Sequence, residues 1–344
     1  MTEFSPRNVL VTGGAGFIGS NWVRSALATD ADVRIVNLDL LTYAGSPENL
    51  RDLPDPARHQ LVEGDIADRP LVDRLLRERE IDTIVHFAAE SHVDRSIAGP
   101  DAFIHTNVLG TFTLLEAARR WWLEEQRLPA ARIRFHHIST DEVYGSLGPG
   151  DPPFTEETAY DPSSPYSASK AGSDHLVQAY HRTYGLPVTI TNCSNNYGPR
   201  QHAEKFIPTI IRKCLAQEAI PVYGDGTNVR DWLYVEDHCR GVDTVLRRGD
   251  VGRTYNIGGN NEWSNIEIAR LICRAMDERS PAKAPHERLI RFVTDRPGHD
   301  WRYAVDISRI RRELGWEPRE SFETGLEKTL DWYLGAWGEA GPPV

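Results

Sequence analysis

A tyrosine and a lysine spaced four residues apart could carry out proton transfer. Tyr166 and Lys170 form a Y-x-x-x-K pattern, with Pro165 directly in front of it. Proline suits the first turn of a helix, and this spacing places both side chains on one helix face. A phenol with a pKa near 10 is only about one part in a thousand ionised at neutral pH. A neighbouring ammonium lowers that pKa in a dry site, so the pair predicts a phenolate base, although an isolated match would indicate only a packed tyrosine and a solvated lysine.

Two adjacent carboxylates, Asp141 and Glu142, follow Thr140 at the end of an apolar segment. In open α/β sheets, ligands bind at the carboxyl ends of the strands. Neighbouring carboxylates there can divide acid and base roles when their surroundings separate their pKa values. Taken alone, such a pair more often marks a solvated turn, so it is a candidate acid–base pair that depends on the other motifs for support.

A glycine-rich loop near the N-terminus predicts a dinucleotide-binding turn. Residues 13–19 contain G-x-G-x-x-G as well as G-x-x-G-x-x-G, between a predicted strand and a predicted helix. Glycines allow the backbone to approach a pyrophosphate, and the helix N-terminus favours its negative charge. Asp39 lies 20 residues beyond Gly19, where a carboxylate can accept hydrogen bonds from a ribose and repel a 2′-phosphate. No arginine lies among residues 39–42, so we expect NAD rather than NADP.

The elements that must position these residues follow a repeated β-α-β order. Strands are predicted over residues 9–12, 33–39, 60–63, 83–88, 132–139 and 188–192, and helices over residues 18–28, 70–80, 101–122 and 165–184. The strands are apolar without alternation, which is typical of strands buried on both faces. Parallel neighbours need crossover connections. The sequence therefore predicts an α/β fold, a Rossmann-type doubly wound parallel sheet with helices on both faces.

The pattern changes after about residue 197. Helices are predicted over residues 206–216, 235–248, 265–276 and 308–313, with Ser264 as the cap of the third, and short motif-like segments separate them. We expect an NAD-binding domain with the catalytic residues over 1–197. We expect a smaller, mixed α/β substrate lobe over 198–344, interleaved with the first domain.

Composition excludes several classes of protein. The 344 residues carry 39 Lys and Arg against 50 Asp and Glu, a formal net charge of −11, so nucleic acid is not an expected partner. No apolar run approaches the roughly 20 residues that cross a bilayer, and we expect neither a membrane partner nor a secretory signal. The four cysteines form no C-x-x-C pair and the histidines no H-E-x-x-H pattern, so no metal is predicted and a cytoplasmic protein is expected.

Further segments join these motifs. They are residues 88–96 (AAESHVDRS), 195–199 (NNYGP), 224–238 and 295–300 (DRPGHD). With them, nearly the whole chain resembles the extended short-chain dehydrogenase/reductase superfamily that acts on nucleotide sugars. Within that superfamily, the Thr-Asp-Glu run at 140–142 is similar to that of the dTDP-glucose 4,6-dehydratases. Residues 200–203 depart from the family pattern, which more often carries an aromatic residue and a proline there.

The resemblance implies an activity and a role for each candidate catalytic residue. The reaction converts dTDP-D-glucose into dTDP-4-keto-6-deoxy-D-glucose by oxidation at C4, loss of water across C5 and C6, and hydride return to C6. Tyr166 takes the C4 hydroxyl proton, and Thr140 bonds that hydroxyl. Lys170 holds the cofactor ribose and, together with the positive nicotinamide ring, lowers the Tyr166 pKa. Glu142 removes the C5 proton while Asp141 protonates the departing hydroxyl.

The expected contacts of the cofactor and of the nucleotide sugar form two sets. NAD is expected to contact Gly13, Gly16, Phe17, Ile18, Gly19, Asp39, Leu40, Thr42, Asp65, Ile66, Phe87, Ala88, Ala89, Thr106, Tyr166, Lys170 and Asn196. The substrate, dTDP-glucose, is expected to contact Ser91, Thr140, Asn195, Glu204, Lys205, Phe206, Pro221, Tyr223, Arg230, Asn265, Arg296 and His299. The helices over 101–122 and 165–184 would suit the four-helix interface of a homodimer.

Two alternatives remain open at this point. A UDP-sugar 4-epimerase or a UDP-glucuronate decarboxylase of the same superfamily would use the tyrosine, the lysine and NAD without needing Asp141 and Glu142. A non-enzymatic NAD-sensing regulator on this scaffold is less well supported, because such proteins often lose the tyrosine or the lysine and this sequence keeps both.

Overall fold

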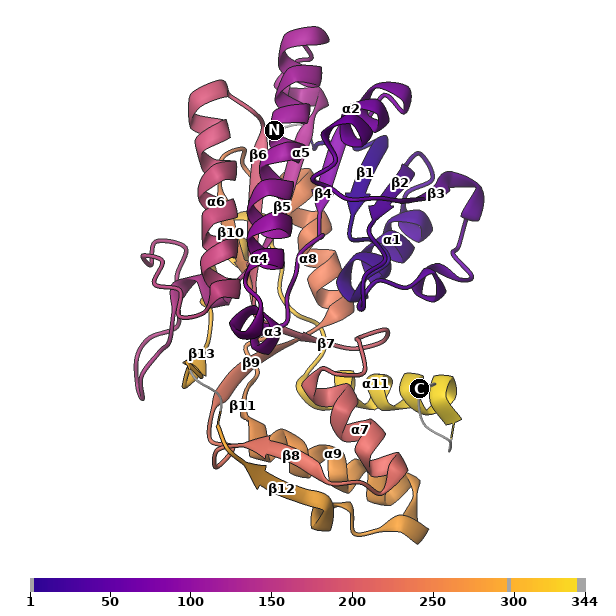
Figure 1. Cartoon of the computed structure of the whole chain (residues 1–344), viewed down its shortest axis with the longest axis vertical. Helices are drawn as coiled ribbons and strands as arrows, with labels where there is room; N and C mark the ends of the chain where they lie inside the picture. Colours follow the sequence, from indigo (N-terminus) through magenta and orange to yellow (C-terminus); the bar gives the residue numbers. More distant parts are fainter. Residues whose placement is uncertain (1–2, 296–297, 339–344) are drawn as a thin grey trace.

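A seven-stranded parallel sheet organises the part of the chain that carries the predicted catalytic residues (Figure 1). The computed structural model describes residues 3–295 and 298–338. The strand order is β10-β6-β5-β4-β1-β2-β3. The bounds are β1 (Asn8–Thr12), β2 (Arg34–Asp39), β3 (His59–Glu63), β4 (Thr83–His86), β5 (Arg134–Thr140), β6 (Val188–Cys193) and β10 (Thr254–Ile257). All six predicted strands are present, which confirms the Rossmann-type α/β fold, and β4 ends two residues earlier than predicted.

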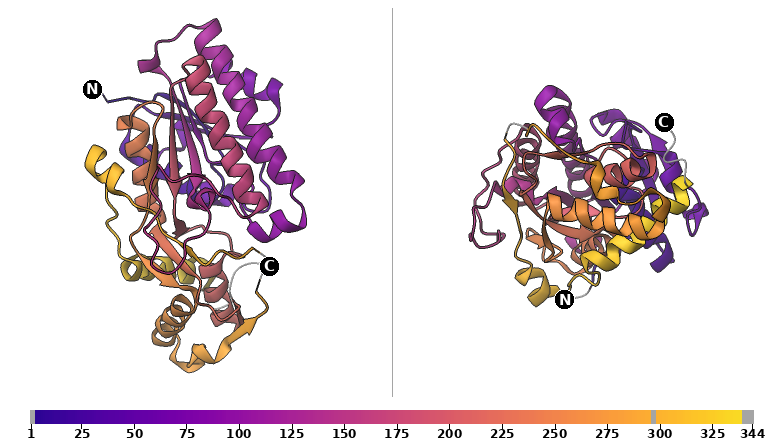
Figure 2. Two further views of the ribbon diagram at one scale, coloured as in Figure 1. Left: turned by 90° about the vertical axis from the view of Figure 1, so that its left-hand side faces the viewer. Right: turned by 90° about the horizontal axis from the view of Figure 1, so that it is seen from below.

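Helices cover both faces of this sheet (Figures 1 and 2). Their bounds are α1 (Phe17–Thr29), α2 (Arg69–Glu78), α3 (Val93–Ala98), α4 (Asp101–Phe103), α5 (Thr111–Ala118), α6 (Pro165–Tyr184) and α8 (Val235–Arg248). Successive side chains of a strand point to opposite faces. Val9 and Val11 of β1 accordingly share a core with α1 and α8, whereas Leu10 packs into a second core with α2, α5 and α6.

The helix predicted over residues 101–122 follows one path but changes its hydrogen-bond pattern along the way. Wide π turns over Ile104–Gly110 and Arg119–Glu125 flank α5. Asn107 of the first π turn accepts from the backbone N–H of Glu90 at 2.9 Å and donates to Ser169 Oγ of α6 at 2.8 Å. The turn therefore ties the segment after β4 to the catalytic helix, which is the kind of local role that π turns often serve.

A second group of elements packs below the carboxyl ends of the sheet (Figure 1). It contains β7 (Asn195–Tyr197), β8 (Ile220–Tyr223), β9 (Val229–Tyr234), β11 (Glu262–Ser264), β12 (Ile290–Val293), β13 (Arg302–Tyr303), α7 (Phe206–Ala216), α9 (Asn265–Arg279), α10 (Ser308–Leu314) and α11 (Phe322–Trp337). Most of these elements enclose a third core that includes Ile211, Ile272 and Leu330. Tyr303 of β13 and Ile310 of α10 belong instead to the first core, which they share with α1 and α8. The chain does not stay in this lobe, because β10 returns to the large sheet and pairs with β6.

The four helices predicted after residue 197 are present as α7, α8, α9 and α10, with α9 three residues longer than predicted. Only α7 and α9 pack into the third core, whereas α8 and α10 pack against the large sheet. Ser264 caps α9 as expected. Its hydroxyl accepts from the Glu267 N–H at 3.4 Å, and the Glu267 carboxylate accepts from the Ser264 N–H at 3.0 Å. Within the part of the chain that the structure describes, no helix has the length and apolarity to span a membrane. All four cysteines are free and buried.

Candidate active site

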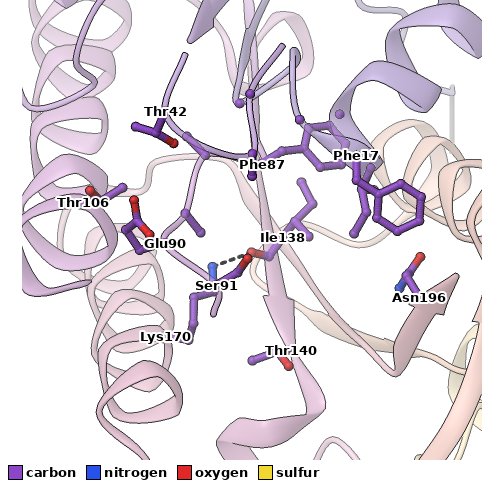
Figure 3. Close-up of a pocket in the computed structure, with 18 of the residues that line it drawn as sticks. Phe17, Thr42, Phe87, Glu90, Ser91, Thr106, Ile138, Thr140, Lys170 and Asn196 are labelled. Carbon is purple, nitrogen blue, oxygen red and sulfur yellow. Dashed lines mark hydrogen bonds between the residues drawn. The ribbon is translucent and has the colours of Figure 1, made fainter. Parts of the chain in front are cut away.

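A cavity of about 320 Å³ opens where the carboxyl ends of β1 to β6 meet (Figure 3). Every residue predicted to contact the cofactor lines it, and so does every predicted catalytic residue. Most of them lie at or just beyond the ends of six different strands, as ligand sites in doubly wound sheets do. The structure thus brings the glycine loop, the carboxylate pair and the Y-x-x-x-K helix into one site.

The glycine loop is shaped for the close approach of an anionic ligand. Gly13 has φ of +70°, and a Cβ there would lie 2.6 Å from the backbone of Ala88, so only glycine fits. Gly16 is the N-cap residue of α1. No side chain caps this helix, and its first turn holds no acidic residue. The helix N-terminus therefore keeps its positive end directed at the cavity, which suits a pyrophosphate.

Asp39 connects this loop to the end of β2. Its carboxylate accepts from the N–H of Ala15 at 2.8 Å through Oδ2 and from the N–H of Leu41 at 2.9 Å through Oδ1. Burial raises the pKa of Asp39, and these two hydrogen bonds oppose the rise. Each carboxylate oxygen can accept a further hydrogen bond. The geometry therefore fits a ribose diol held beside a loop that the same carboxylate helps to shape.

The carboxylate pair lies immediately beyond β5. Thr140 ends the strand and caps a 3-10 turn over Asp141–Tyr144, with its Oγ1 accepting from the Glu142 N–H at 3.3 Å. Asp141 is almost fully buried, and its Oδ2 finds no hydrogen-bond partner among the described residues. Burial, followed by the charges of Glu142 and Asp231, raises the pKa of Asp141 well above its ordinary value. The site thus favours the protonated form of Asp141, which is the form a general acid needs.

Helix α6 presents Tyr166 and Lys170 to the same cavity. The helix begins with a capping box between Ser164 and Ser167, with Pro165 in the first turn. The Lys170 ammonium donates to the Ile138 carbonyl of β5 at 2.7 Å (Figure 3). Both side chains are buried, and their placement beside Thr140 agrees with the sequence pattern.

The protein groups alone shift the pKa of Tyr166 upward. Burial, followed by the charge of Glu142, raises this pKa well above 10, and a hydrogen bond with Thr140 opposes the rise. Desolvation of the phenolate thus outweighs the effect of the neighbouring protein groups. The predicted lowering by Lys170 together with the positive nicotinamide ring concerns the site with NAD bound, and it stays a prediction.

The residues predicted to bind the substrate are only partly brought together. Ser91, Thr140, Asn195 and Lys205 line the cavity, and Lys205 Nζ donates to the Ser91 carbonyl at 3.1 Å. Outside its lining lie Glu204, Phe206, Pro221, Tyr223, Arg230, Asn265 and His299. Arg296 falls outside the described residues. For these positions the substrate contact stays a prediction.

Their present contacts are within the protein. Glu204 accepts from Arg95 at 2.9 Å. Arg230 donates to the Asp300 carbonyl at 2.9 Å, and its guanidinium lies 4.3 Å from the centre of the Tyr303 ring. The first contact joins α3 to the loop before α7, and the contacts of Arg230 lie within the second lobe.

Several residues outside the predicted contacts also line the cavity. They are Leu38, Ala44, Gly45, Gly64, Glu90, Ile138, Ser139, Cys193, Ser194, Gln201 and His202. Five of them, such as Glu90 and Ser194, directly neighbour a predicted contact, and Cys193 is the last residue of β6. Gln201 and His202 lie in the segment that departs from the family pattern, and no motif placed them in the cavity.

The sheet is parallel, the glycine loop follows β1, and one cavity holds Thr140, Tyr166 and Lys170. These features together define the class of the extended short-chain dehydrogenases/reductases. Comparison with known proteins agrees. The family model described as GDP-mannose 4,6 dehydratase matches residues 10–329. A dTDP-glucose 4,6-dehydratase of Xanthomonas campestris pv. campestris (strain B100) is 58% identical over 330 residues, covering 94% of this chain and 92% of that protein. The chain belongs to the dTDP-glucose 4,6-dehydratase family.

Solved structures show the same relationship. The crystal structure of DesIV, a dTDP-glucose 4,6-dehydratase from Streptomyces venezuelae with NAD and TYD bound, superimposes with a TM-score of 0.86 at 48% identity, covering 96% of this chain and 98% of that chain. A UDP-glucose 4-epimerase from Thermotoga maritima has a TM-score of 0.83 but only 27% identity, covering 96% and 99% of the two chains. The fold is thus shared with epimerases, whereas the sequence similarity is much greater to dehydratases.

Proposed function

We propose that this chain converts dTDP-D-glucose into dTDP-4-keto-6-deoxy-D-glucose with NAD as a resident cofactor. The observation that carries the proposal is the presence of Asp141 and Glu142 in the same cavity as Tyr166, Lys170 and the glycine loop. An oxidation alone needs only the tyrosine and the lysine, whereas removal of water also needs an acid and a base. The dehydratase names of relatives at more than half identity support the same activity.

The cavity residues fit NAD. The first turn of α1 is open to a pyrophosphate, Asp39 is suited to the adenosine ribose, and Lys170 to the nicotinamide ribose. Ala88 and Ala89 are small, so the cofactor can lie against the backbone after β4. When bound, NAD supplies the electron acceptor for oxidation at C4 and the donor for reduction at C6, so it is not consumed over a full turnover.

The first chemical step of the protein groups is removal of the proton from the C4 hydroxyl. Tyr166 accepts that proton, and Thr140 bonds the same hydroxyl and orients it. Oxidation of C4 to a ketone then makes the neighbouring C5 hydrogen acidic, since it lies α to a carbonyl. The oxidation therefore precedes every step that breaks a bond at C5.

The second task is the removal of water across C5 and C6. Glu142 takes the C5 proton, and Asp141 gives its proton to the departing C6 hydroxyl, which leaves as water. Glu142 then returns a proton to C5. Burial and the Glu142 charge raise the pKa of Asp141 well above its ordinary value, which favours the protonated acid before this step.

Mass spectrometry in deuterated water tests the proposed function. Wild-type protein incubated with dTDP-glucose should yield a product lighter by one water that carries deuterium at C5. Glu142→Gln should lose at least about 10²-fold in kcat, the usual worth of a positioned base. Glu278→Gln, at an exposed carboxylate on α9, is the matched control and should keep wild-type turnover. Product formation by Glu142→Gln at the wild-type rate would remove the assigned base.

The epimerase and decarboxylase alternatives predict different products. With UDP-sugars, either activity would leave no deoxysugar, and the base-induced absorbance of a 4-keto-6-deoxy sugar would be missing. The sequence similarity to the T. maritima epimerase is about half that to DesIV, which favours the dehydratase.

We assign residues 1–197 mainly to the cofactor and the catalytic groups, and residues 198–344 mainly to the nucleotide sugar. The lining of the cavity by Asn195 and Lys205 supports a substrate that spans the two parts. The return of β10 to the large sheet means that the two parts interleave. Four free cysteines support a cytoplasmic location, where thiols stay reduced.

A homodimer is the proposed assembly. Apolar side chains lie exposed along α3 to α5 and at the end of α6, among them Ile97, Ile104, Leu109, Phe112 and Tyr184. Helices α5 and α6 run side by side on one face (Figure 2), and such a face suits a symmetric four-helix contact. Sedimentation should give twice the 38.8 kDa chain mass for wild type and one chain mass for Phe112→Asp. A wild-type monomer at micromolar concentration would contradict the dimer.

A further inference from the structure

A buried carboxylate lies one helical turn beyond Lys170. Asp174 of α6 is 2% exposed and does not line the cavity. Burying a charge is costly unless hydrogen bonds and an opposite charge compensate it. Its contacts therefore indicate what it does.

Those contacts reach the strand that carries the catalytic carboxylates. Asp174 Oδ2 accepts from Ser139 Oγ at 2.7 Å and from Tyr160 Oη at 2.9 Å. Its Oδ1 lies 3.1 Å from His137 Nε2. Ser139 and His137 belong to β5, and Ser139 directly precedes Thr140. Asp174 thus fastens α6 to the last residues of β5.

The second link is electrostatic and runs to Lys170. Burial lowers the pKa of the Lys170 ammonium, and the charge of Asp174 is the largest influence that opposes this. The ammonium itself donates to the Ile138 carbonyl, the residue before Ser139. Lys170 and Asp174 therefore hydrogen-bond two adjacent residues of β5, Ile138 and Ser139.

We propose that Asp174 is a positioning residue for the dehydratase reaction, which keeps Lys170 charged and fixes the end of β5 that carries Thr140, Asp141 and Glu142. The inference rests on the proposed function, and it concerns a residue behind the cavity wall. Asp174 acts through its neighbours and touches neither sugar nor cofactor.

The titratable groups facing Asp174 are Lys170 and His175 on α6, His137 on β5, Tyr144 after β5, and Tyr160 in the loop before α6. Burial raises the pKa of Asp174 to about 6, while Lys170 and the hydrogen bonds from Ser139 and Tyr160 oppose the rise. Burial holds the pKa of His137 well below its usual range, so that ring stays neutral. Below about pH 6, Asp174 therefore gains a proton and Lys170 loses its counter-charge.

The pH dependence of kcat with dTDP-glucose, from pH 5 to 10, tests the proposal. In Asp174→Asn the counter-charge is absent at every pH, so Lys170 loses its proton more easily. The alkaline midpoint of kcat should move down by at least about one pH unit, the usual effect of one close charge, with KM changed less than twofold. Asp237→Asn is the matched control, because Asp237 is also buried but bonds the N–H groups of residues 319 and 320. Its profile should coincide with wild type.

Tyr160→Phe gives an independent test that keeps the carboxylate. It removes one donor that lowers the pKa of Asp174, so the acid midpoint of kcat should move to higher pH. If Asp174→Asn fails to fold, this variant decides the matter. An unshifted alkaline midpoint in a folded Asp174→Asn, or an unshifted acid midpoint in Tyr160→Phe, overturns the role of Asp174. Wild-type protein that makes no product would instead overturn the proposed function.

Discussion

Asp141 and Tyr166 share one environment, in which burial raises the pKa of both groups and the charge of Glu142 adds to the rise. Two potential acids therefore hold their protons beside one carboxylate. For Asp141 this agrees with the role of an acid. For Tyr166 it means that the base form needs a positive charge in addition to the protein groups that surround the phenol.

Asp141→Asn removes the proton donor while keeping the size and most of the polarity of the side chain. We expect kcat to fall about 10²-fold or more, because a positioned general acid contributes roughly that much. Product formation measured by the absorbance of the keto sugar in base checks this. Asp161→Asn, at an exposed carboxylate ahead of α6, should turn over like wild type. Unchanged turnover of Asp141→Asn would show that the proton for the departing C6 hydroxyl comes from another group.

Residue-level inference from sequence worked where the backbone decides the position. The ends of parallel strands converge on one edge of the sheet, so Asp39, Thr140 and the glycine loop could be placed in one cavity from their strands alone. It was weaker for Arg230 and Tyr223, because they lie on short strands of the second lobe whose orientation depends on long-range packing. The raised pKa of Tyr166 depends on the depth of burial, which spacing does not reveal.

At the scale of single elements, end signals determine where helices start. Helix α9 begins with the reciprocal hydrogen bonds of Ser264 and Glu267, which satisfy two N–H groups at the helix start. Ser264→Ala should lower the free energy of unfolding by about 1 kcal/mol, the usual worth of such a cap. Urea titration followed by circular dichroism measures it. Ser280→Ala, at the other end of the same helix, should cost less, because no helix N–H bonds its side chain.

The predicted elements with strong local signals are confirmed, and those without them were missed. Helix α6 has Pro165 and Ser164 at its start and Gly185 at its end, and its predicted bounds agree with the structure. The strands of the second lobe are two to six residues long, too short for a pattern to appear. Helix α11 is an exception, because it was not predicted although Phe322, Leu326 and Leu330 repeat at helical spacing after Ser321. The π turn over Ile104–Gly110 carries the tertiary contacts of Asn107, which no local pattern in the sequence reveals.

Across the whole molecule, four histidines are buried against the large sheet. Burial lowers the pKa of His86, His136, His137 and His238, the last to about 3. In the unfolded chain each would take up a proton near pH 6.5. The unfolded state therefore binds more protons below that pH, and stability is lost as the pH falls from 6.5 toward the lower folded-state values. Buried carboxylates whose pKa is raised, among them Asp39, Asp141, Asp174 and Asp231, act in the opposite sense, so the histidine contribution is measured one residue at a time.

His238→Leu isolates one of these histidines. Neither ring nitrogen has a hydrogen-bond partner among the described residues, so at pH 7 the substitution should change stability little. Between pH 6 and 4 the slope of unfolding free energy against pH should fall by about 1.4 kcal/mol per pH unit, the value for one proton. Urea titrations at several pH values measure the slope. An unchanged slope in His238→Leu would contradict the assignment.

The pairing of β10 with β6 has a consequence for how the protein is made. The ribosome completes β1 to β6 before it reaches residue 200. The edge of β6 nevertheless stays unpaired until residues 254–257 have also been synthesised. An unpaired strand edge is a template for pairing with other chains. Nascent chains that pause between these two points therefore expose the unpaired edge of β6. A fragment that ends at residue 197 would expose this edge permanently.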